Sequence, residues 1–307
     1  MAKNTVYVIG HKSPDTDSVS SAIAYSEYLK KGKIDAVAAV CGDLNSETKF
    51  VLKYFGAKPP KKLESAAGKT LVLVDHNEKS QMVDGADSAK IIEVLDHHKI
   101  SFEWPEPIKY RAEPLGSTAT LVAKIMLANK FKITKQLAGL LVSAILSDTV
   151  VFKSTTTTVD DIKIAKVLGK IAKIANLKTF GIEIKKQKAS LKGMNAAQIL
   201  HSDFKTFEAS GKKFAIGQIE VVELEEAQNR TAELLKEMEE TNAKEKLAFT
   251  ALMVTDIINC GSQILIAGDA SIIEKAFEKA CINNAIYLEN MMSRKKDLLP
   301  PVMKAIQ

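Results

Sequence analysis

Short apolar, β-branched runs alternate with longer amphipathic segments through the first part of this 307-residue chain. The runs that predict buried strands lie at residues 5–10, 35–41, 70–75 and 90–95. The first segments that predict helices lie at residues 17–31 and 46–56. Because strand–helix–strand alternation favours right-handed crossovers, the pattern predicts a mainly parallel sheet flanked by helices.

Three longer helical patterns follow, at residues 116–129, 134–147 and 159–176. After them comes the polar stretch KKQKASLKGMN, from Lys185 to Asn195, whose lysine, serine and glycine content is typical of a linker. We therefore expect an N-terminal domain, a linker and a C-terminal domain, at residues 1–187, 188–194 and 195–307.

The region after the linker predicts a second, smaller α/β domain. Its strand patterns lie near residues 203–207, 213–221, 248–257 and 262–267. An acidic helix is expected from Leu224 and a last helix from Ser271. The predicted fold class is therefore α/β for both domains.

The amino-acid composition predicts a protein with well-filled cores and without disulfides or membrane-spanning helices. An apolar content of 46% is enough to fill the cores of two domains. The three cysteines have no CxxC spacing, and the sequence has no secretory leader, so we expect reduced thiols and a cytoplasmic location. No apolar run approaches the roughly 20 residues that a bilayer-spanning helix needs, which predicts no membrane partner.

The charge distribution argues against nucleic acid as a partner. The formal net charge is +6, and residues 1–187 carry 28 basic against 20 acidic side chains. The remaining residues carry 15 basic against 17 acidic side chains. Nucleic-acid binders typically interleave basic stripes with aromatic residues, and aromatic residues make up only 6% of this chain.

Histidine and aspartate gather where predicted strands end. His11 follows the first strand, His76 the third, and His97 and His98 the fourth. Parallel strands present their carboxyl ends at one edge of a sheet, where ligands usually bind. The clustering therefore predicts a metal centre at that edge.

The first of these stretches, GHKSPDTDS, has the spacing H-x-x-x-D-x-D. Two aspartates two residues apart in a turn can face different ions, so Asp15 and Asp17 beside His11 favour a pair of metals. The alternative is that one aspartate caps the next helix while His11 is incidental, and this stretch alone favours that interpretation. The two further strand ends of similar chemistry favour the metal site.

Asp75 ends the apolar run LVLVD. A buried, unpaired carboxylate costs several kcal/mol, a cost that a ligand bridging two cations would avoid. The alternative is that Asp75 caps a turn beside an exposed His76.

In Asp96-His97-His98, adjacent histidines at a strand end face different directions, so one can bind metal while the next meets a substrate anion.

Asp148 follows the apolar stretch LAGLLVSAIL. A carboxylate at the carboxyl end of a helix meets the unfavourable end of the helix dipole, so a cationic partner such as a metal is attractive there. The alternative is that Asp148 lies in solvent.

Gly116-Ser117-Thr118 precedes another helical pattern, and we expect it to be a plain N-cap rather than an anion site.

Taken together, GHKSPDTDS, LVDHN, LDHH, SDT and the distal Ser293-Arg294-Lys295 resemble the family II inorganic pyrophosphatases of the DHH phosphoesterase superfamily. The resemblance spans nearly the whole chain. Single motifs such as D-x-D are weak, but their order and spacing together are specific. The length resembles the form without regulatory inserts, with a DHH catalytic domain and a DHHA2-like substrate-binding domain.

The resemblance implies a set of site residues. One metal would be held by His11, Asp15 and Asp75. The second would be held by Asp17, Asp75, His97 and Asp148. The residues implied to contact substrate phosphate are His98, Lys205, Arg294 and Lys295. The family also implies two manganese or cobalt ions, additional magnesium with the substrate, and a homodimer formed through the N-terminal domain.

The expected reaction is attack of a metal-bridging hydroxide on pyrophosphate, in a cleft between the domains. Asp15 or Asp148 would orient the nucleophile, and a protonated His98 would stabilise the leaving phosphate. Asp96 is expected to fix a histidine from outside the metal shell. The role of Lys296 stays open.

Three alternatives remain. An exopolyphosphatase would need the same cations and only a more open cleft. A nanoRNA or cyclic-dinucleotide phosphodiesterase is disfavoured by the terminal SRK and by the lack of a GGGH-like motif. A non-catalytic metal- or nucleotide-binding module would be indicated by a missing ligand, and all six expected ligands are present.

Overall fold

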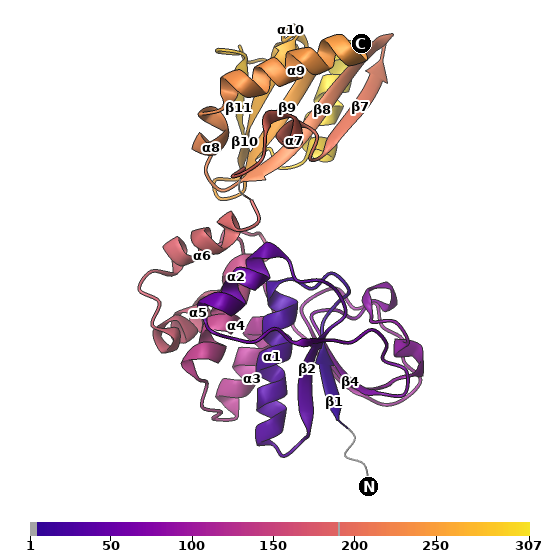
Figure 1. Ribbon diagram of the computed structural model, residues 1–307, viewed down its shortest axis with the longest axis vertical. Helices are drawn as coiled ribbons and strands as arrows, with labels where there is room; N and C mark the ends of the chain where they lie inside the picture. Colours follow the sequence, from indigo (N-terminus) through magenta and orange to yellow (C-terminus); the bar gives the residue numbers. More distant parts are fainter. Residues whose placement is uncertain (1–4, 190) are drawn as a thin grey trace. The chain divides into compact units, whose positions relative to one another are not determined.

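A computed structural model describes residues 5–189 and 191–307 of the chain. It divides into two compact units, unit 1 (Met1–Lys188) and unit 2 (Ala189–Gln307), coloured from indigo to pink and from pink to yellow in Figure 1. Among the described residues, no helix has the length and apolar character needed to cross a bilayer.

The described residues of unit 1 form a six-stranded parallel sheet in the order β3-β2-β1-β4-β5-β6. The strands are β1 (Val6–Ile9), β2 (Ala36–Val40), β3 (Lys61–Lys62), β4 (Thr70–Val74), β5 (Lys90–Asp96) and β6 (Lys109–Ala112). Every residue of β4 is buried, because this apolar strand lies inside the sheet between β1 and β5. The carboxyl ends of β1, β4 and β5 therefore meet at one edge.

The helices of unit 1 pack against this sheet and against one another. They are α1 (Thr16–Lys31), α2 (Ser46–Tyr54), α3 (Thr118–Ala128), α4 (Lys135–Asp148), α5 (Val159–Ala172) and α6 (Leu177–Lys186), with short 3-10 turns at Lys79–Gln81 and Ala86–Ser88. Residues 137–147 of α4 are all buried, since α1, α3, α5 and α6 pack around that helix. This explains why the sequence of α4 is apolar on all sides.

The described residues of unit 2 form a five-stranded mixed sheet in the order β11-β10-β9-β8-β7. The strands are β7 (Phe204–Ala209), β8 (Lys212–Val221), β9 (Phe249–Asp256), β10 (Gly261–Gly268) and β11 (Ala285–Glu289). β8 and β9 pair in parallel and the other neighbours pair antiparallel.

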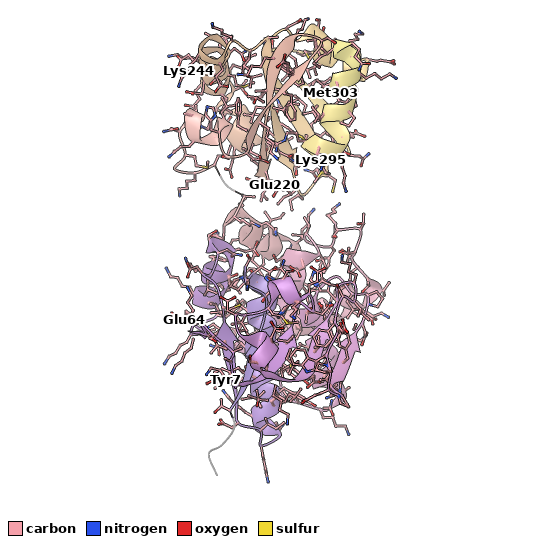
Figure 2. The ribbon with its side chains drawn as sticks, turned by 90° about the vertical axis from the view of Figure 1, so that its right-hand side faces the viewer. Tyr7, Glu64, Glu220, Lys244, Lys295 and Met303 are labelled. Carbon is pink, nitrogen blue, oxygen red and sulfur yellow. The ribbon has the colours of Figure 1, made fainter. Side chains whose placement is uncertain are left out.

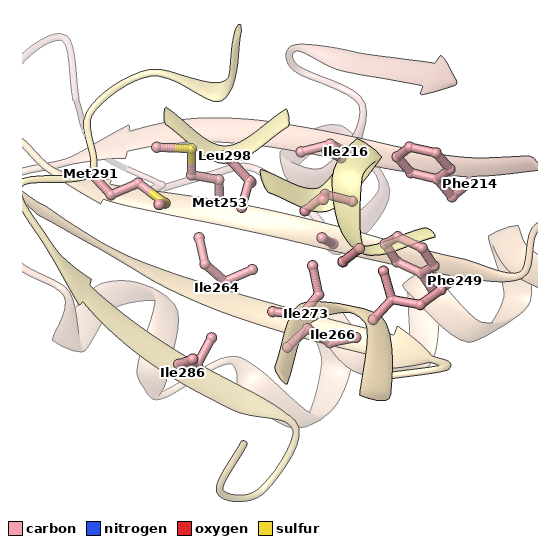
Figure 3. Packing of buried hydrophobic residues seen from close by; sticks show 14 residues of the cluster. Phe214, Ile216, Phe249, Met253, Ile264, Ile266, Ile273, Ile286, Met291 and Leu298 are labelled. Carbon is pink, nitrogen blue, oxygen red and sulfur yellow. The ribbon is translucent and has the colours of Figure 1, made fainter. Parts of the chain in front are cut away.

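Apolar side chains cover both faces of the second sheet. Phe214, Phe249 and Ile264 pack on one face with residues of α10 (Ser271–Phe277) and α11 (Leu299–Ile306), as Figure 3 shows for the labelled residues. On the other face, Leu234 and Met238 pack against further buried residues of the sheet. The remaining helices are α7 (Ala196–Leu200), α8 (Glu225–Gln228), α9 (Thr231–Glu245) and a π-helical turn η3 (Arg294–Leu298).

The predicted two-domain α/β architecture is confirmed, with a parallel first sheet and a smaller second domain. Two details of the element assignment are wrong. The helix expected from Leu224 is broken at Asn229 and Arg230, which lie between α8 and α9. The helix from Ser271 is not the last element, because β11, η3 and α11 follow it.

Candidate metal centre

Strand and helix ends bring the predicted ligands to one edge of the first sheet. His11 lies just after β1, Asp75 follows β4, and His97 follows β5. Asp15 caps the amino end of α1 and Asp17 lies in its first turn, whereas Asp148 is the last residue of α4. Because β1, β4 and β5 are neighbours in the sheet, residues distant in the sequence become adjacent in space.

His11, Asp15 and Asp75 form one group, whose ligand atoms lie within 4.8 Å of one another. His11 Nε2 is 3.6 Å from Asp15 Oδ2 and 3.4 Å from Asp75 Oδ2. The other oxygen of Asp15 accepts a hydrogen bond of 2.9 Å from the backbone N–H of Ser18. Asp15 therefore caps α1 with one oxygen and faces the candidate metal site with the other.

Asp17, Asp75, His97 and Asp148 form a second group within the same distance limit. His97 Nε2 is 3.4 Å from Asp75 Oδ1 and 4.0 Å from Asp148 Oδ2. The opposite nitrogen of His97, Nδ1, lies 2.9 Å from the carbonyl oxygen of Leu115, which leaves Nε2 to face the carboxylates. Asp75 belongs to both groups and turns one carboxylate oxygen toward each histidine.

Asp75 is also held in an unusual backbone conformation. Its φ angle is 63°, in the left-handed region that residues other than glycine rarely adopt. Its N–H donates to the carbonyl of Leu95 at 2.9 Å, and Thr118 Oγ1 donates to its Oδ1 at 3.0 Å. Backbone strain of this kind is commonly kept where it places a functional side chain.

The amino end of α3 holds Asp17. The backbone N–H groups of Thr118 and Ala119 donate to its carboxylate at 2.6 and 2.8 Å, and Ser21 Oγ donates at 3.1 Å. Ser117 caps α3 as expected. Sequence reasoning missed that the amides of this helix end bind a carboxylate of the chain itself, although a helix amino end attracts any nearby anion.

Two carboxylates of the cluster are disfavoured in their charged form, by burial and by the negative charges around them. Burial raises the pKa of Asp17 to about 7, and the charge of Asp75 acts in the same direction. Burial also raises the pKa of Asp148 well above its usual value, reinforced by the charge of Asp17. Two of the four carboxylates therefore resist ionisation unless positive charge is supplied.

The two histidines, by contrast, are stabilised in their charged form. Burial acts to lower the pKa of His11 and of His97, but the carboxylates beside them outweigh it and raise each pKa to about 10. Burial acts to raise the pKa of Asp75, yet hydrogen bonds from His11 and His97 hold it well below the usual range. The cluster attracts either protons or cations.

This donor set fits divalent metal ions. Each group combines imidazole nitrogen with carboxylate oxygen, and none of the three cysteines within the described residues belongs to either group. Nitrogen and oxygen ligands of this kind suit manganese, cobalt and magnesium better than metals that require thiolate. Two groups that share Asp75 can hold two ions side by side.

Asp96 fixes His98. The Asp96 side chain is fully buried and accepts hydrogen bonds from His98 Nδ1 at 2.9 Å and from Asn77 Nδ2 at 2.5 Å. The hydrogen bond to Asp96 raises the pKa of His98. His98 Nδ1 also lies 4.0 Å from Asp75 Oδ1, but its bond to Asp96 makes it a poor metal ligand. Nε2 is left for another partner.

Asn77 is a site residue that sequence reasoning missed. Besides its bond to Asp96, it donates to the carbonyl of Lys99 at 2.9 Å and accepts from the N–H of Ser101 at 2.5 Å. It therefore ties the segment after β5 to the segment after β4. Its place in LVDHN, two residues after Asp75, was the available signal.

His76 stays outside both ligand groups. It is buried, its Nδ1 lies 2.9 Å from the carbonyl oxygen of Val74, and burial lowers its pKa, so it is neutral. It is one of the residues that line a cavity of about 580 Å³ beside the cluster, with His11, Asp15, Asp75, His97, His98 and Asp148. A larger cavity, of about 1030 Å³, lies beside Phe102 and Trp104 and includes none of the predicted ligands.

Apart from His98, the predicted phosphate contacts belong to unit 2. Lys205 is exposed on β7, and Lys295 is exposed in η3 at the same edge of the unit as Glu220 (Figure 2). Arg294 is buried, and its Nη2 donates to both carboxylate oxygens of Asp203, at 2.8 and 2.9 Å. In this structure the guanidinium of Arg294 is therefore engaged within unit 2.

Two family models match the chain: the DHH family N-terminal domain over residues 5–145 and the DHHA2 domain over residues 182–305. A manganese-dependent inorganic pyrophosphatase of Methanocaldococcus jannaschii is 43% identical, over 97% of this chain and 98% of its own length. One of Methanothrix thermoacetophila is 44% identical over the full length of both chains. A solved Methanococcus jannaschii structure, assigned provisionally to the family II inorganic pyrophosphatases, has 42% identity and a TM-score of 0.64 and covers 98% of this chain.

Proposed function

This chain belongs to the DHH family, in the branch of two-domain manganese-dependent inorganic pyrophosphatases, and we propose that it hydrolyses pyrophosphate to two phosphates at the centre around Asp75. The observation that carries the proposal is the position of Asp75, one oxygen of which faces His11 and the other His97. A carboxylate shared by two ligand groups is suited to bridge a pair of metal ions.

The six ligands would divide between two ions. His11, Asp15 and Asp75 would hold one, and Asp17, Asp75, His97 and Asp148 would hold the other. When bound, two divalent cations supply Lewis-acid stabilisation of phosphoryl oxygens and lower the pKa of a shared water. We propose manganese or cobalt at these positions and additional magnesium with the substrate.

Exposure separates the roles of the four carboxylates. The side chain of Asp15 is 41% exposed and that of Asp148 is 18% exposed, whereas Asp75 is 2% exposed. Asp17 is fully buried and already accepts three hydrogen bonds from the protein. Asp15 and Asp148 are therefore the carboxylates that can accept a hydrogen bond from the attacking water and orient it.

His98 is suited to the leaving phosphate. Asp96 holds its Nδ1 and favours the protonated ring, so that Nε2–H is a donor. The side chain of His98 is 53% exposed, unlike that of His97 at 13%, so substrate can reach it. We propose that His98 donates a hydrogen bond from Nε2–H to the leaving phosphate. Asp96 would act through His98 as a positioning residue.

We also propose that further cations of this chain bind the substrate. Four carboxylates against two divalent ions leave the centre near neutral by formal charge, so a polyanion requires further positive groups. Lys205 and Lys295 are exposed and available for phosphate. Arg294 would have to exchange Asp203 for phosphate.

Two further proposals rest on the family resemblance. We propose that the protein is cytoplasmic and that it forms a homodimer through unit 1. Light scattering coupled to size-exclusion chromatography tests the dimer, and unit 1 expressed alone would have to retain it. A monomer at micromolar concentration would contradict the proposal.

A substrate panel tests the function directly. Purified protein with millimolar manganese should release phosphate from pyrophosphate much faster than from tripolyphosphate, nucleotides or short RNA. Equal or faster turnover of tripolyphosphate would instead identify an exopolyphosphatase, and turnover of RNA a phosphodiesterase. Manganese binding without turnover of any of these substrates would identify a non-catalytic module.

A further inference from the structure

A second polar cluster is centred on the buried side chain of Glu47. It contains residues that directly neighbour the proposed metal ligands in the sequence but none of the ligands themselves. Glu47, in the first turn of α2, is only 2% exposed. Its Oε1 accepts hydrogen bonds from Thr16 Oγ1 at 2.7 Å and from Ser147 Oγ at 2.5 Å. Thr16 stands between the ligands Asp15 and Asp17, and Ser147 directly precedes the ligand Asp148. One carboxylate oxygen thus ties the start of α1 to the end of α4.

Lys185, in the last turn of α6, neutralises Glu47. Its Nζ lies 3.3 Å from Glu47 Oε2 and donates to the carbonyl of Ser147 at 3.4 Å and to its hydroxyl at 3.3 Å. The lysine side chain is only 15% exposed. A buried carboxylate without a cationic partner is strongly unfavourable, so the pair is needed once Glu47 is buried. The ammonium also meets the favourable carboxyl end of α4.

The same helix start binds the segment by which the chain leaves unit 1. Ser46 Oγ donates to the carbonyl oxygen of Gln187 at 2.6 Å. Unit 1 ends one residue later, at Lys188. The first two residues of α2 are therefore bonded both to the neighbours of three metal ligands and to the end of α6.

We propose that Glu47 and Lys185 form a positioning pair for the metal centre. Through Thr16 and Ser147 they fix the separation between Asp15 and Asp17 on α1 and Asp148 on α4, and they link that separation to the exit segment of unit 1. The inference rests on the proposed metal centre. A buried ion pair that served folding alone would not need its hydrogen bonds to attach beside ligands on both helices.

Metal affinity separates a positioning role from a purely structural one. Glu47→Gln removes the charge and keeps the shape, and Lys185→Met removes the ammonium and keeps much of the stem. Lys178→Met, an exposed lysine in the first turn of the same helix, is the matched control. Manganese binding is measured by calorimetry on metal-free protein, and circular dichroism checks that each variant is folded.

The manganese dissociation constant should rise about 10- to 100-fold in Glu47→Gln and Lys185→Met, the usual range for residues that support metal ligands. Lys178→Met should stay within about twofold of the wild type by the same standard. Lys185→Arg keeps the charge and should recover part of the affinity. Folded Glu47→Gln and Lys185→Met proteins with wild-type manganese affinity would overturn the proposal.

If the charge variants do not fold, two variants that keep both charges test the positioning role instead. Thr16→Val and Ser147→Ala keep the Glu47–Lys185 ion pair but remove the hydroxyl that bonds it to α1 or to α4, so each should weaken manganese binding. Unchanged affinity in both would overturn the inference. The measurement uses no pyrophosphate, so a wild-type protein that binds manganese but leaves pyrophosphate intact would refute the proposed function alone.

Discussion

The guanidinium of Arg294 is bound to the carboxylate of Asp203 across 91 residues of sequence, with Nη2 donating to both of its oxygens. Nη1 donates to the carbonyl oxygens of Asp203 at 2.6 Å and Ile216 at 3.1 Å. A carboxylate presents its two oxygens much as a phosphate does, and Arg binds both in a bidentate manner. If Arg294 binds substrate as proposed, Asp203 therefore occupies the donors that pyrophosphate would use.

Replacing Asp203 with Asn should tighten substrate binding. The two carbonyl bonds to Nη1 would still hold the arginine. The amide of Asn would leave Nη2 only one uncharged acceptor oxygen in place of two carboxylate oxygens, so phosphate would compete for Nη2 more easily. A charge-assisted hydrogen bond contributes about 1.5–3 kcal/mol, and the 53% exposure of Asp203 reduces this, so we expect the KM for pyrophosphate to fall about threefold to tenfold. Steady-state kinetics would show the change in KM with little change in kcat.

Glu208→Gln, the same loss of charge at an exposed position of β7, is the control and should leave KM unchanged. A rise in KM for Asp203→Asn would mean that Asp203 positions Arg294 for the substrate instead of competing with it.

Asp75 is expected to be indispensable because both ligand groups include it. Asp75→Asn keeps the size of the side chain but removes the charge that the two proposed ions would share. We expect kcat to fall at least about a hundredfold and both manganese ions to bind more weakly. Calorimetric titration and phosphate release measure the two effects. Asp43→Asn, at a side chain that is 93% exposed, should change neither, and a fully active Asp75→Asn would refute the bridging role.

Much of this site could be predicted from the sequence because several of its residues lie directly after the strands of the first sheet. LVLVD and IIEVLDHH are apolar enough to be recognised as inner strands, and parallel strands bring their carboxyl ends together without further information. The ligand types then follow from the residues at those ends. No knowledge of side-chain packing is needed for that step.

The parts that escaped prediction depend on contacts between distant residues. Glu47 in SET reads as an ordinary acidic residue in a first helical turn, where the helix dipole already favours it, so its burial against Lys185 is invisible. Strand β6, with the sequence KYRA, is half-exposed and lacks apolar alternation. Helix α11 has two prolines directly after its first residue, Leu299, which resemble a loop although proline is tolerated in a first turn.

Asp96 should control the pH dependence of catalysis through His98. Its hydrogen bond is the main reason why the pKa of His98 is raised, so in Asp96→Asn that pKa should return toward the ordinary value. If the protonated ring is the active form, activity falls as pH rises through this pKa. The alkaline fall in kcat should therefore move to lower pH in Asp96→Asn, with activity at pH 8 reduced about tenfold.

A structural role alone for Asp96 would lower kcat equally at all pH values and leave the profile in place. His98→Gln provides the matching control, since it removes the titrating ring and should abolish this limb of the profile. A profile of unchanged shape in both variants would exclude a role for the protonated ring of His98 in catalysis.

Manganese and protons should compete for the ligand cluster, and the sign of the effect follows from the pKa shifts. His11 and His97 have pKa values raised to about 10, and Asp17 has a pKa raised to about 7. A group whose pKa is higher in the folded than in the unfolded state stabilises the fold at low pH and loses that contribution as pH rises through the folded value. Asp75 is ionised throughout this range and contributes no slope.

The free energy of unfolding of chelated, metal-free protein should therefore fall between pH 6.5 and 10. If His11 and His97 bind manganese as proposed, the metal must displace their protons, so its binding should release protons and become tighter as pH rises. Thermal unfolding with chelator and with manganese, scanned from pH 6.5 to 9 to avoid metal hydroxide, measures the difference. The gap between the two melting temperatures should widen with pH. Parallel curves would show that these histidines do not bind the metal.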